Sequence, residues 1–238
     1  MNRFGSITDC CYSFAMALLF LTACGDTDET TESNHENTTF IGSLEITNSA
    51  DLETLENIST INGDLIITSQ GLEEISINGL RKINGNLTIR QNTTLRDINI
   101  SNLQDVGGIT VESNTSVKNI HLPLLEQSGS LLEFENNQEL TNIDLPSLRK
   151  IGSILLINAN TRIIQINAPL LSDVNSHFFI NRNPSLTTLE LSSLSLVGGV
   201  LEITDNINLD SCNVSDIVNN LEPENNQEFS TERNGVCR

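Results

Sequence analysis

A repeat of 21 to 23 residues runs through most of the chain and restricts the fold more than any other feature of the sequence. Each repeat contains two apolar residues separated by one other residue. The first apolar positions are Leu44, Leu65, Leu87, Ile109, Leu132, Leu155, Phe178 and Leu201. The second are Ile46, Ile67, Ile89, Val111, Phe134, Ile157, Ile180 and Ile203. This alternation predicts eight short, half-buried strands, because successive side chains of a strand point to opposite faces.

The corners of each repeat carry two characteristic residue types. Glycine introduces most repeats, and we interpret it as a corner residue that tolerates positive φ. These glycines are Gly42, Gly63, Gly85, Gly108, Gly129, Gly152 and Gly199. Asparagine stands three residues after the second apolar position, at Asn92, Asn114, Asn137, Asn160, Asn183 and Asn206, with Ser49 and Gln70 in the first two repeats. A buried amide at that place can bond the next coil, which predicts an asparagine ladder.

The repeat resembles a known family most clearly at residues 140–152, with the sequence LTNIDLPSLRKIG. This segment resembles the receptor L-domain, the ligand-binding module of insulin-receptor and epidermal-growth-factor-receptor ectodomains. The resemblance implies a mainly β, right-handed, leucine-rich-repeat-like β-solenoid of about eight rungs over residues 40–221, with a C-terminal cap at residues 222–238. The cysteine-rich modules of those receptors are absent from this sequence, so their ligands and signalling are not implied.

The N-terminus has the features of an export signal. Residues 1–23 hold a short apolar run that predicts a signal peptide. The run ends in Leu-Thr-Ala-Cys24, which resembles the lipobox of bacterial lipoproteins and implies lipidation of Cys24; an ordinary signal peptide with a coincidental cysteine is the alternative. Residues 24–39 are acidic and lack Lys and Arg, which predicts a flexible tether. We therefore expect a lipid-anchored protein of the cell envelope, in the outer membrane or at the cell surface.

Two cysteines remain for the mature chain, since Cys10 and Cys11 lie in the predicted signal peptide and Cys24 is the predicted lipid site. In an oxidising envelope, Cys212 and Cys237 are expected to form a disulfide worth about 3 kcal/mol. The bridge would hold the C-terminal cap over the last coil, and residues 215–221 predict a short helix within it. A metal or redox pair is the alternative, but the spacing is far from Cys-x-x-Cys.

Composition and motifs limit the chemistry that the chain is expected to perform. A net charge of -19 with only 12 Lys and Arg disfavours nucleic acid as a partner. The three histidines, His35, His121 and His177, are too dispersed in the sequence for a metal or nucleophile site, so we expect no metal, no cofactor and no catalytic residue. Outward carboxylates such as Glu133, Glu135 and Asp144 keep a carbohydrate-active β-helix enzyme as an alternative.

The outward positions of the first strand in each repeat suggest a partner surface. In early repeats these positions are mostly polar, whereas late repeats place apolar or aromatic residues there: Leu131, Ile154, Leu156, His177, Phe179 and Val200. A contiguous exposed apolar patch marks an interaction site, unless the cap or a loop covers it. We therefore predict a non-catalytic binding or adhesion scaffold for an unknown protein or glycan ligand, with a purely structural envelope spacer as a further alternative.

Overall fold

The computed structural model describes residues 38–222 and 228–237. The predicted signal peptide, Cys24, His35 and nearly all of the predicted tether lie outside these residues. The first strand, β1 (Thr38–Ile41), includes the last two residues of the range expected for the tether.

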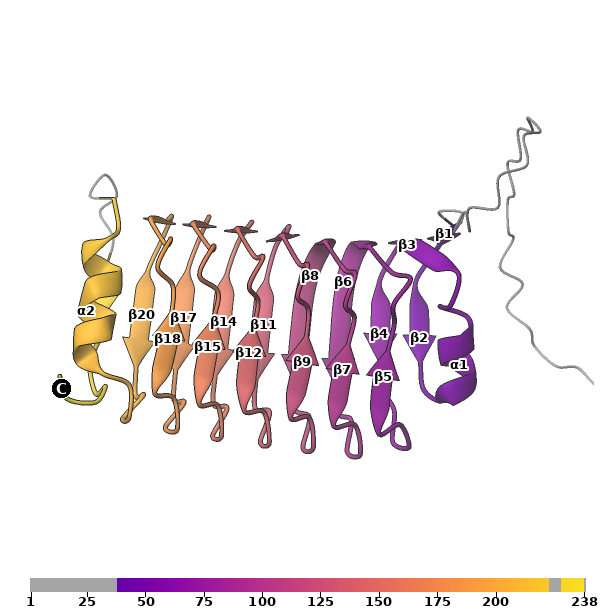
Figure 1. Cartoon of the computed structure of the whole chain (residues 1–238), viewed down its shortest axis with the longest axis horizontal. Coiled ribbons are helices and arrows are strands. Elements are labelled where there is room, and N and C mark those ends of the chain that lie inside the picture. The colour runs from indigo at the N-terminus through magenta and orange to yellow at the C-terminus, as the bar shows by residue number, and fades with distance from the viewer. Residues whose placement is uncertain (1–37, 223–227, 238) are drawn as a thin grey trace, which may run out of the picture. The chain divides into compact units, whose positions relative to one another are not determined.

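The described chain is a parallel-strand β-solenoid of about seven turns with little helix (Figure 1). The larger sheet contains β1, β2 (Leu44–Ile46), β3 (Ile58–Asn62), β4 (Leu65–Ile67), β6 (Lys82–Arg90), β8 (Asp105–Glu112), β10 (Gln127–Ser128), β11 (Leu132–Glu135), β13 (Lys150–Ile151), β14 (Leu155–Asn158), β16 (Asp173–Val174), β17 (Phe178–Asn181), β19 (Leu196–Val197), β20 (Leu201–Thr204) and β21 (Phe229–Ser230). The smaller sheet contains β5 (Glu74–Ser76), β7 (Asp97–Asn99), β9 (Asn119–His121), β12 (Asn142–Asp144), β15 (Gln165–Asn167) and β18 (Thr188–Glu190). Two helices accompany them, α1 (Ser49–Glu53) and α2 (Ser211–Asn219).

The core is mainly aliphatic, with Phe134 and Phe178 as buried aromatic members, and lies between the two sheets. The predicted inward residues of the large sheet are buried, with the exception of Leu44, which is half-buried on β2, a strand that pairs only with β4. Equivalent core positions stand opposite one another in neighbouring strands, so that Leu132 pairs with Leu155 and Leu155 with Phe178. Burial alternates along these strands because each strand presents only one face to the core.

The corner glycines serve a different purpose from the one we expected. Among the described glycines only Gly42 has positive φ, at +121°. Gly63 and Gly152 are required by close approach between coils instead: a Cβ at Gly63 would lie 2.3 Å from the Gly42 carbonyl oxygen, and one at Gly152 would lie 2.0 Å from that of Gly129. The stacking of one coil's corner on the next excludes a side chain there.

Positive φ occurs at the opposite corner, directly before the asparagines. The residues in this left-handed conformation are Gln91, Ser113, Asn136, Ala159, Arg182, Asp205 and Arg233. None is glycine, so the corner imposes a strained conformation on ordinary residues. The asparagine that follows each of them supplies hydrogen bonds that hold the bend.

The six asparagines form a continuous column in which every side chain is fully buried. Each donates its backbone N–H to the Oδ1 of the next, as from Asn114 to Asn137 (3.3 Å) and from Asn137 to Asn160 (3.0 Å). Each also donates from Nδ2 to a carbonyl of the preceding coil, as from Asn137 to Val111 (2.8 Å). These bonds satisfy polar groups that the corner would otherwise leave unpaired in the core.

The two ends of the column differ from the expectation. Ser69, and not Gln70, donates its backbone N–H to the Oδ1 of Asn92 (2.6 Å), because the second repeat is one residue shorter at this corner. Ser49 is the first residue of α1, whose N-cap is Asn48. At the other end, Asn234 accepts from the backbone N–H of Asn206 (3.3 Å) and donates to the Ile203 carbonyl (2.6 Å), which extends the column by one residue.

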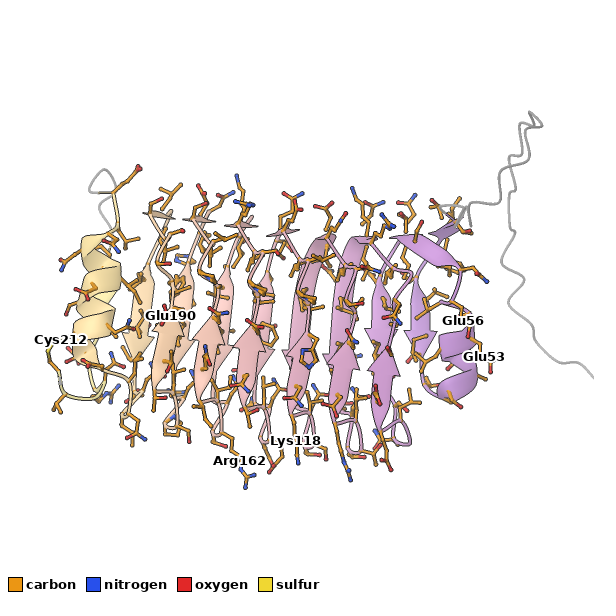
Figure 2. The ribbon with its side chains drawn as sticks, in the orientation of Figure 1. Glu53, Glu56, Lys118, Arg162, Glu190 and Cys212 are labelled. Atoms are coloured by element: carbon orange, nitrogen blue, oxygen red, sulfur yellow. A yellow bond between two sulfur atoms is a disulfide. The ribbon has the colours of Figure 1, made fainter. Side chains whose placement is uncertain are left out.

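The C-terminal segment therefore continues the repeat. β21 pairs in parallel with β20, and Arg233 and Asn234 repeat the left-handed residue and asparagine of earlier corners. α2 begins at Ser211, four residues before the predicted helix, because Asp210 accepts a hydrogen bond from the Cys212 backbone N–H (2.8 Å). The disulfide between Cys212 and Cys237 is present, with 5.0 Å between the Cα atoms, and ties α2 to the end of the chain (Figure 2).

Candidate binding surface

The outward residues of the large sheet stand in columns, because its strands pair in parallel register. Leu156 on β14 stands opposite Phe179 on β17, which in turn stands opposite Glu202 on β20. A second column lies directly before the strands and includes His177 and Val200. Backbone hydrogen bonds connect its residues to the neighbouring strands, such as the one from Phe178 N–H to the Val200 carbonyl (2.9 Å). We define the apolar strip as the six predicted residues, all half-buried: Leu131, Ile154, Leu156, His177, Phe179 and Val200.

The structure thus places the six predicted residues side by side. The same outward column is mostly polar in earlier strands, where it holds Glu45 on β2, Thr88 on β6 and Thr110 on β8, with Ile66 on β4 as the apolar exception. The change occurs at β11, whose outward Glu133 stands opposite Leu156. In this column the apolar residues after β11 are Leu156 and Phe179, and Glu202 on β20 is acidic again.

Two rings at the centre of the apolar strip are held in a fixed arrangement. His177 and Phe179 stack with 5.5 Å between ring centroids and 17° between ring planes. The backbone N–H of Val200 donates to Nδ1 of His177 (3.0 Å), which orients the imidazole. Because His177 directly precedes β17 and is separated from Phe179 only by Phe178, the imidazole supports one side of the phenyl ring and keeps it upright on the sheet.

A shallow pocket of about 310 Å³ opens beside Phe179. One wall is the column of Leu156, Phe179 and Glu202. The facing wall is the next outward column, formed by Asn158, Asn181 and Thr204. At the corner of the coil the pocket is completed by Arg182, Asp205 and Arg233.

Arg233 reaches this pocket from the C-terminal segment. Its Nε lies 2.8 Å from Oδ1 of Asp205, which forms an ion pair at the pocket's edge. Arg233 is not among the predicted site residues, because we expected the C-terminal segment to be a cap. The pair Arg233-Asn234 has the same two residues as Arg182-Asn183 at an earlier corner, and this is the signal that could have revealed it.

The outward face of the smaller sheet has a different character. It also carries a pocket, of about 340 Å³, along β9, β12 and β15. Its outward side chains are polar, including Asn119, His121, Asp144 and Asn167, and Glu190 on β18 is exposed on the same face (Figure 2). Asn167 donates to Asp144 (2.7 Å). The buried residues Ile120 and Ile143 also line this pocket, but no phenyl ring does.

The carboxylates considered for catalysis are separated. Glu133 and Glu135 share β11, whereas Asp144 lies on the smaller sheet. Burial raises the pKa of Glu133 above its usual value, and the neighbouring carboxylates Glu135 and Glu112 raise it further, against the hydrogen bond from Thr110 (3.2 Å). The charged groups that act on Glu133, namely Glu135 and Glu112, are thus also acids. None of them is a basic partner for a proton on Glu133.

The cysteine and histidine residues do not gather into a metal centre within the described part of the chain. Asp210, Cys212 and Cys237 lie close together, but the two sulfur atoms are bonded to each other and offer no thiolate. His121 is on β9 of the smaller sheet, whereas His177 lies in the apolar strip of the larger one.

Searches of family models, curated proteins and solved structures found no match to this chain. Among the described residues, no helix has the length and apolar character needed to cross a bilayer. What this chain can be said to bind must therefore be argued from its own surface.

Proposed function

We propose that this protein is a lipid-anchored envelope protein that serves as a non-catalytic binding scaffold, with the apolar strip as its contact surface. The strip carries the proposal. It joins aromatic and aliphatic side chains on adjacent strands and borders a pocket with polar side chains, whereas monomeric proteins seldom leave such a patch without a partner. A purely structural spacer would need no such surface.

The anchoring part of the proposal rests on the N-terminal sequence. The apolar run and Leu-Thr-Ala-Cys24 resemble a lipoprotein signal, and the acidic residues that follow would form a tether between lipid and solenoid. Two or more acyl chains hold a protein durably at a membrane. Such a tether would present the apolar strip away from the bilayer, in the outer membrane or at the cell surface.

The finer architecture that we propose is a right-handed, eight-rung solenoid of receptor L-domain type with a C-terminal cap. The eight apolar pairs and the asparagine column support the rung count and the family likeness. Parallel crossover connections are right-handed in about 98% of cases, which supports the handedness. α2 and the disulfide support a cap at the C-terminal end.

Anchoring is tested by intact-mass measurement on the full chain isolated from membranes of an expressing Gram-negative host. We expect a chain that begins at Cys24 and carries the added mass of acyl groups, and protease treatment of intact cells should remove the solenoid. Cys24→Ala should release the protein from the membrane fraction. An uncleaved, unmodified N-terminus would contradict the anchoring proposal.

Binding is tested by applying the mature chain to an array of neutral glycans, acidic glycans, peptides and phospholipids. We expect at least one class to give a signal that Phe179→Ala removes. Ile66→Ala is the matched control, because Ile66 occupies the same outward column on β4, outside the apolar strip. If no class gives a Phe179-dependent signal, the apolar strip is not a binding surface.

A further inference from the structure

We propose that the pocket beside Phe179 binds a neutral carbohydrate, with one sugar ring packed against the phenyl face. This inference rests on the proposed function and names its ligand class. The pocket measures about 310 Å³, at the lower end of the range of about 300–1,000 Å³ for small-ligand sites. It would therefore hold a short part of an oligosaccharide and leave the rest in solvent.

The aromatic wall is suited to the apolar face of a sugar. His177 supports one side of the Phe179 ring, and the opposite side faces along the strand toward Asn181. A sugar ring has C–H groups on one face and hydroxyls around its edge, so it can pack on an aromatic ring while its hydroxyls remain available. Leu156 extends the same wall across the neighbouring strand.

The facing wall offers a donor and an acceptor to hydroxyl groups. Asn158 donates its Nδ2 to Glu135 (2.6 Å), which leaves its Oδ1 as an acceptor. Asn181 uses its Oδ1 to accept from the backbone N–H and hydroxyl of Thr204 (both 3.2 Å), and no described residue accepts from its Nδ2. A hydroxyl both donates and accepts, so neighbouring sugar hydroxyls can satisfy this pair of amides.

The charge of the pocket favours a neutral ligand. Glu202 and Asp205 contribute two carboxylates and Arg182 and Arg233 two guanidinium groups, so the charges balance. Asp205 and Arg233 are paired with each other. The whole chain carries a net charge of -19, which repels anionic polymers at a distance. An acidic glycan or a phosphate would therefore meet an unfavourable field from the whole chain, and the two guanidinium groups of the pocket are matched in number by its two carboxylates.

A peptide fits this surface less well. The backbone of β17 is paired on both sides, with β14 and with β20. A peptide that adds a strand to a sheet needs a free edge, and none exists at β17. Peptides remain a distinct outcome of the test.

The test is titration calorimetry of the mature protein with maltohexaose, cellohexaose, xylohexaose and mannohexaose, and with a hyaluronan hexasaccharide as the acidic probe. We expect at least one neutral hexasaccharide to bind, and Phe179→Ala to weaken that binding by about tenfold or more, the scale of a lost aromatic contact. Phe179→Leu retains an apolar side chain and should also weaken binding, because the flat ring is lost. Asn181→Ala should weaken it by a smaller factor, and Ile66→Ala should not change it.

The outcomes separate this inference from the proposed function. A Phe179-dependent signal on the array from peptides, lipids or acidic glycans, with no neutral hexasaccharide bound, would overturn the carbohydrate assignment and leave the binding scaffold intact. Neutral hexasaccharide binding that is equal in wild type and in both Phe179 variants would place the sugar elsewhere and overturn the site. If no probe of any class depends on Phe179, both proposals fail.

Discussion

The asparagine column and the apolar strip are two exceptions to the usual placement of polar side chains outside and apolar side chains inside. They differ in whether other groups of the chain compensate for the exception. The column places polar amides in the core, with 0% exposure at each of the six predicted positions. The strip places aliphatic and aromatic side chains on the outside, where they are half-buried. Both run along the solenoid axis, and both repeat once per coil.

The difference lies in whether the exception is compensated within the chain. Every amide of the column is bonded to the next coil, so burial of the polar groups costs little. The apolar side chains of the strip gain only the contact with their neighbours, and their remaining surface faces water. The compensated exception has a structural role, and we propose that the uncompensated one is a contact surface.

The largest effect that tests this comparison is expected for Asn137→Ala. The substitution leaves the Val111 carbonyl and the Asn114 backbone N–H without their partners in the core, which should lower the free energy of unfolding by about 4 kcal/mol. Urea unfolding followed by circular dichroism measures it. Asn142→Ala, at an exposed asparagine of β12, is the control. Equal losses in the two variants would show that the column does not support the fold.

Loss of the disulfide should have the next largest effect. The Cys212→Ser, Cys237→Ser double variant opens a loop of 25 residues and should lose about 3 kcal/mol. The last bond of the column, from Asn206 to Asn234, lies within the segment that the disulfide holds. Hydrogen exchange should therefore show faster exchange at the Asn206 amide, but not at Asn114. Unchanged protection of Asn206 would show that the column ends independently of the disulfide.

A smaller effect on stability is expected for Phe179→Ala. Phe179 is half-buried outside the sheet, so its removal should cost about 1 kcal/mol. Its neighbour Phe178 has 0% exposure, and Phe178→Ala should cost about 4 kcal/mol. Thermal and urea unfolding of the two variants compare a core ring with a strip ring. Similar losses would mean that the strip belongs to the structural core and is not a free surface.

The smallest effect concerns Glu133, which stands opposite Leu156 at the edge of the apolar strip. Burial raises its pKa, so the folded state disfavours the carboxylate relative to the unfolded state. Glu133 therefore adds stability below its ordinary pKa of 4.5, and this contribution is lost as the pH rises through the folded value. Melting temperatures of wild type and Glu133→Gln, measured from acidic to neutral pH, should diverge in favour of the variant as the pH rises. Glu45→Gln controls for the loss of one negative charge; an identical pH dependence in wild type and Glu133→Gln would refute the effect.

Much of the fold could be predicted because the relevant signals are local. A residue such as Ile157 is inward because Leu155 and Ile157 alternate with outward residues, and this depends only on strand geometry. The same alternation assigned Leu156 and Phe179 to the outer face. The Cys212 and Cys237 pair followed from the cysteine count.

The composition of the pocket beside Phe179 could be predicted only in part. Leu156 and Phe179 were named, but their facing partners Asn158 and Asn181 carry no distinctive sequence signal. Arg233 enters the pocket only because β21 pairs with β20. Arg233 and Asp205, which are in contact there, are 28 positions apart in the sequence, and their contact depends on the path of the chain through α2.

The sequence by itself determined the repeat, the inward and outward positions and the buried asparagines, because each depends on spacing within one coil. Tertiary structure decided why Gly63 and Gly152 are glycines, where the left-handed corner lies, and that the C-terminal segment continues the solenoid. These features arise from contacts between coils, whose residues are 21 or more positions apart. The physical reason is that stacking distance and coil-to-coil hydrogen bonds exist only once the solenoid has formed.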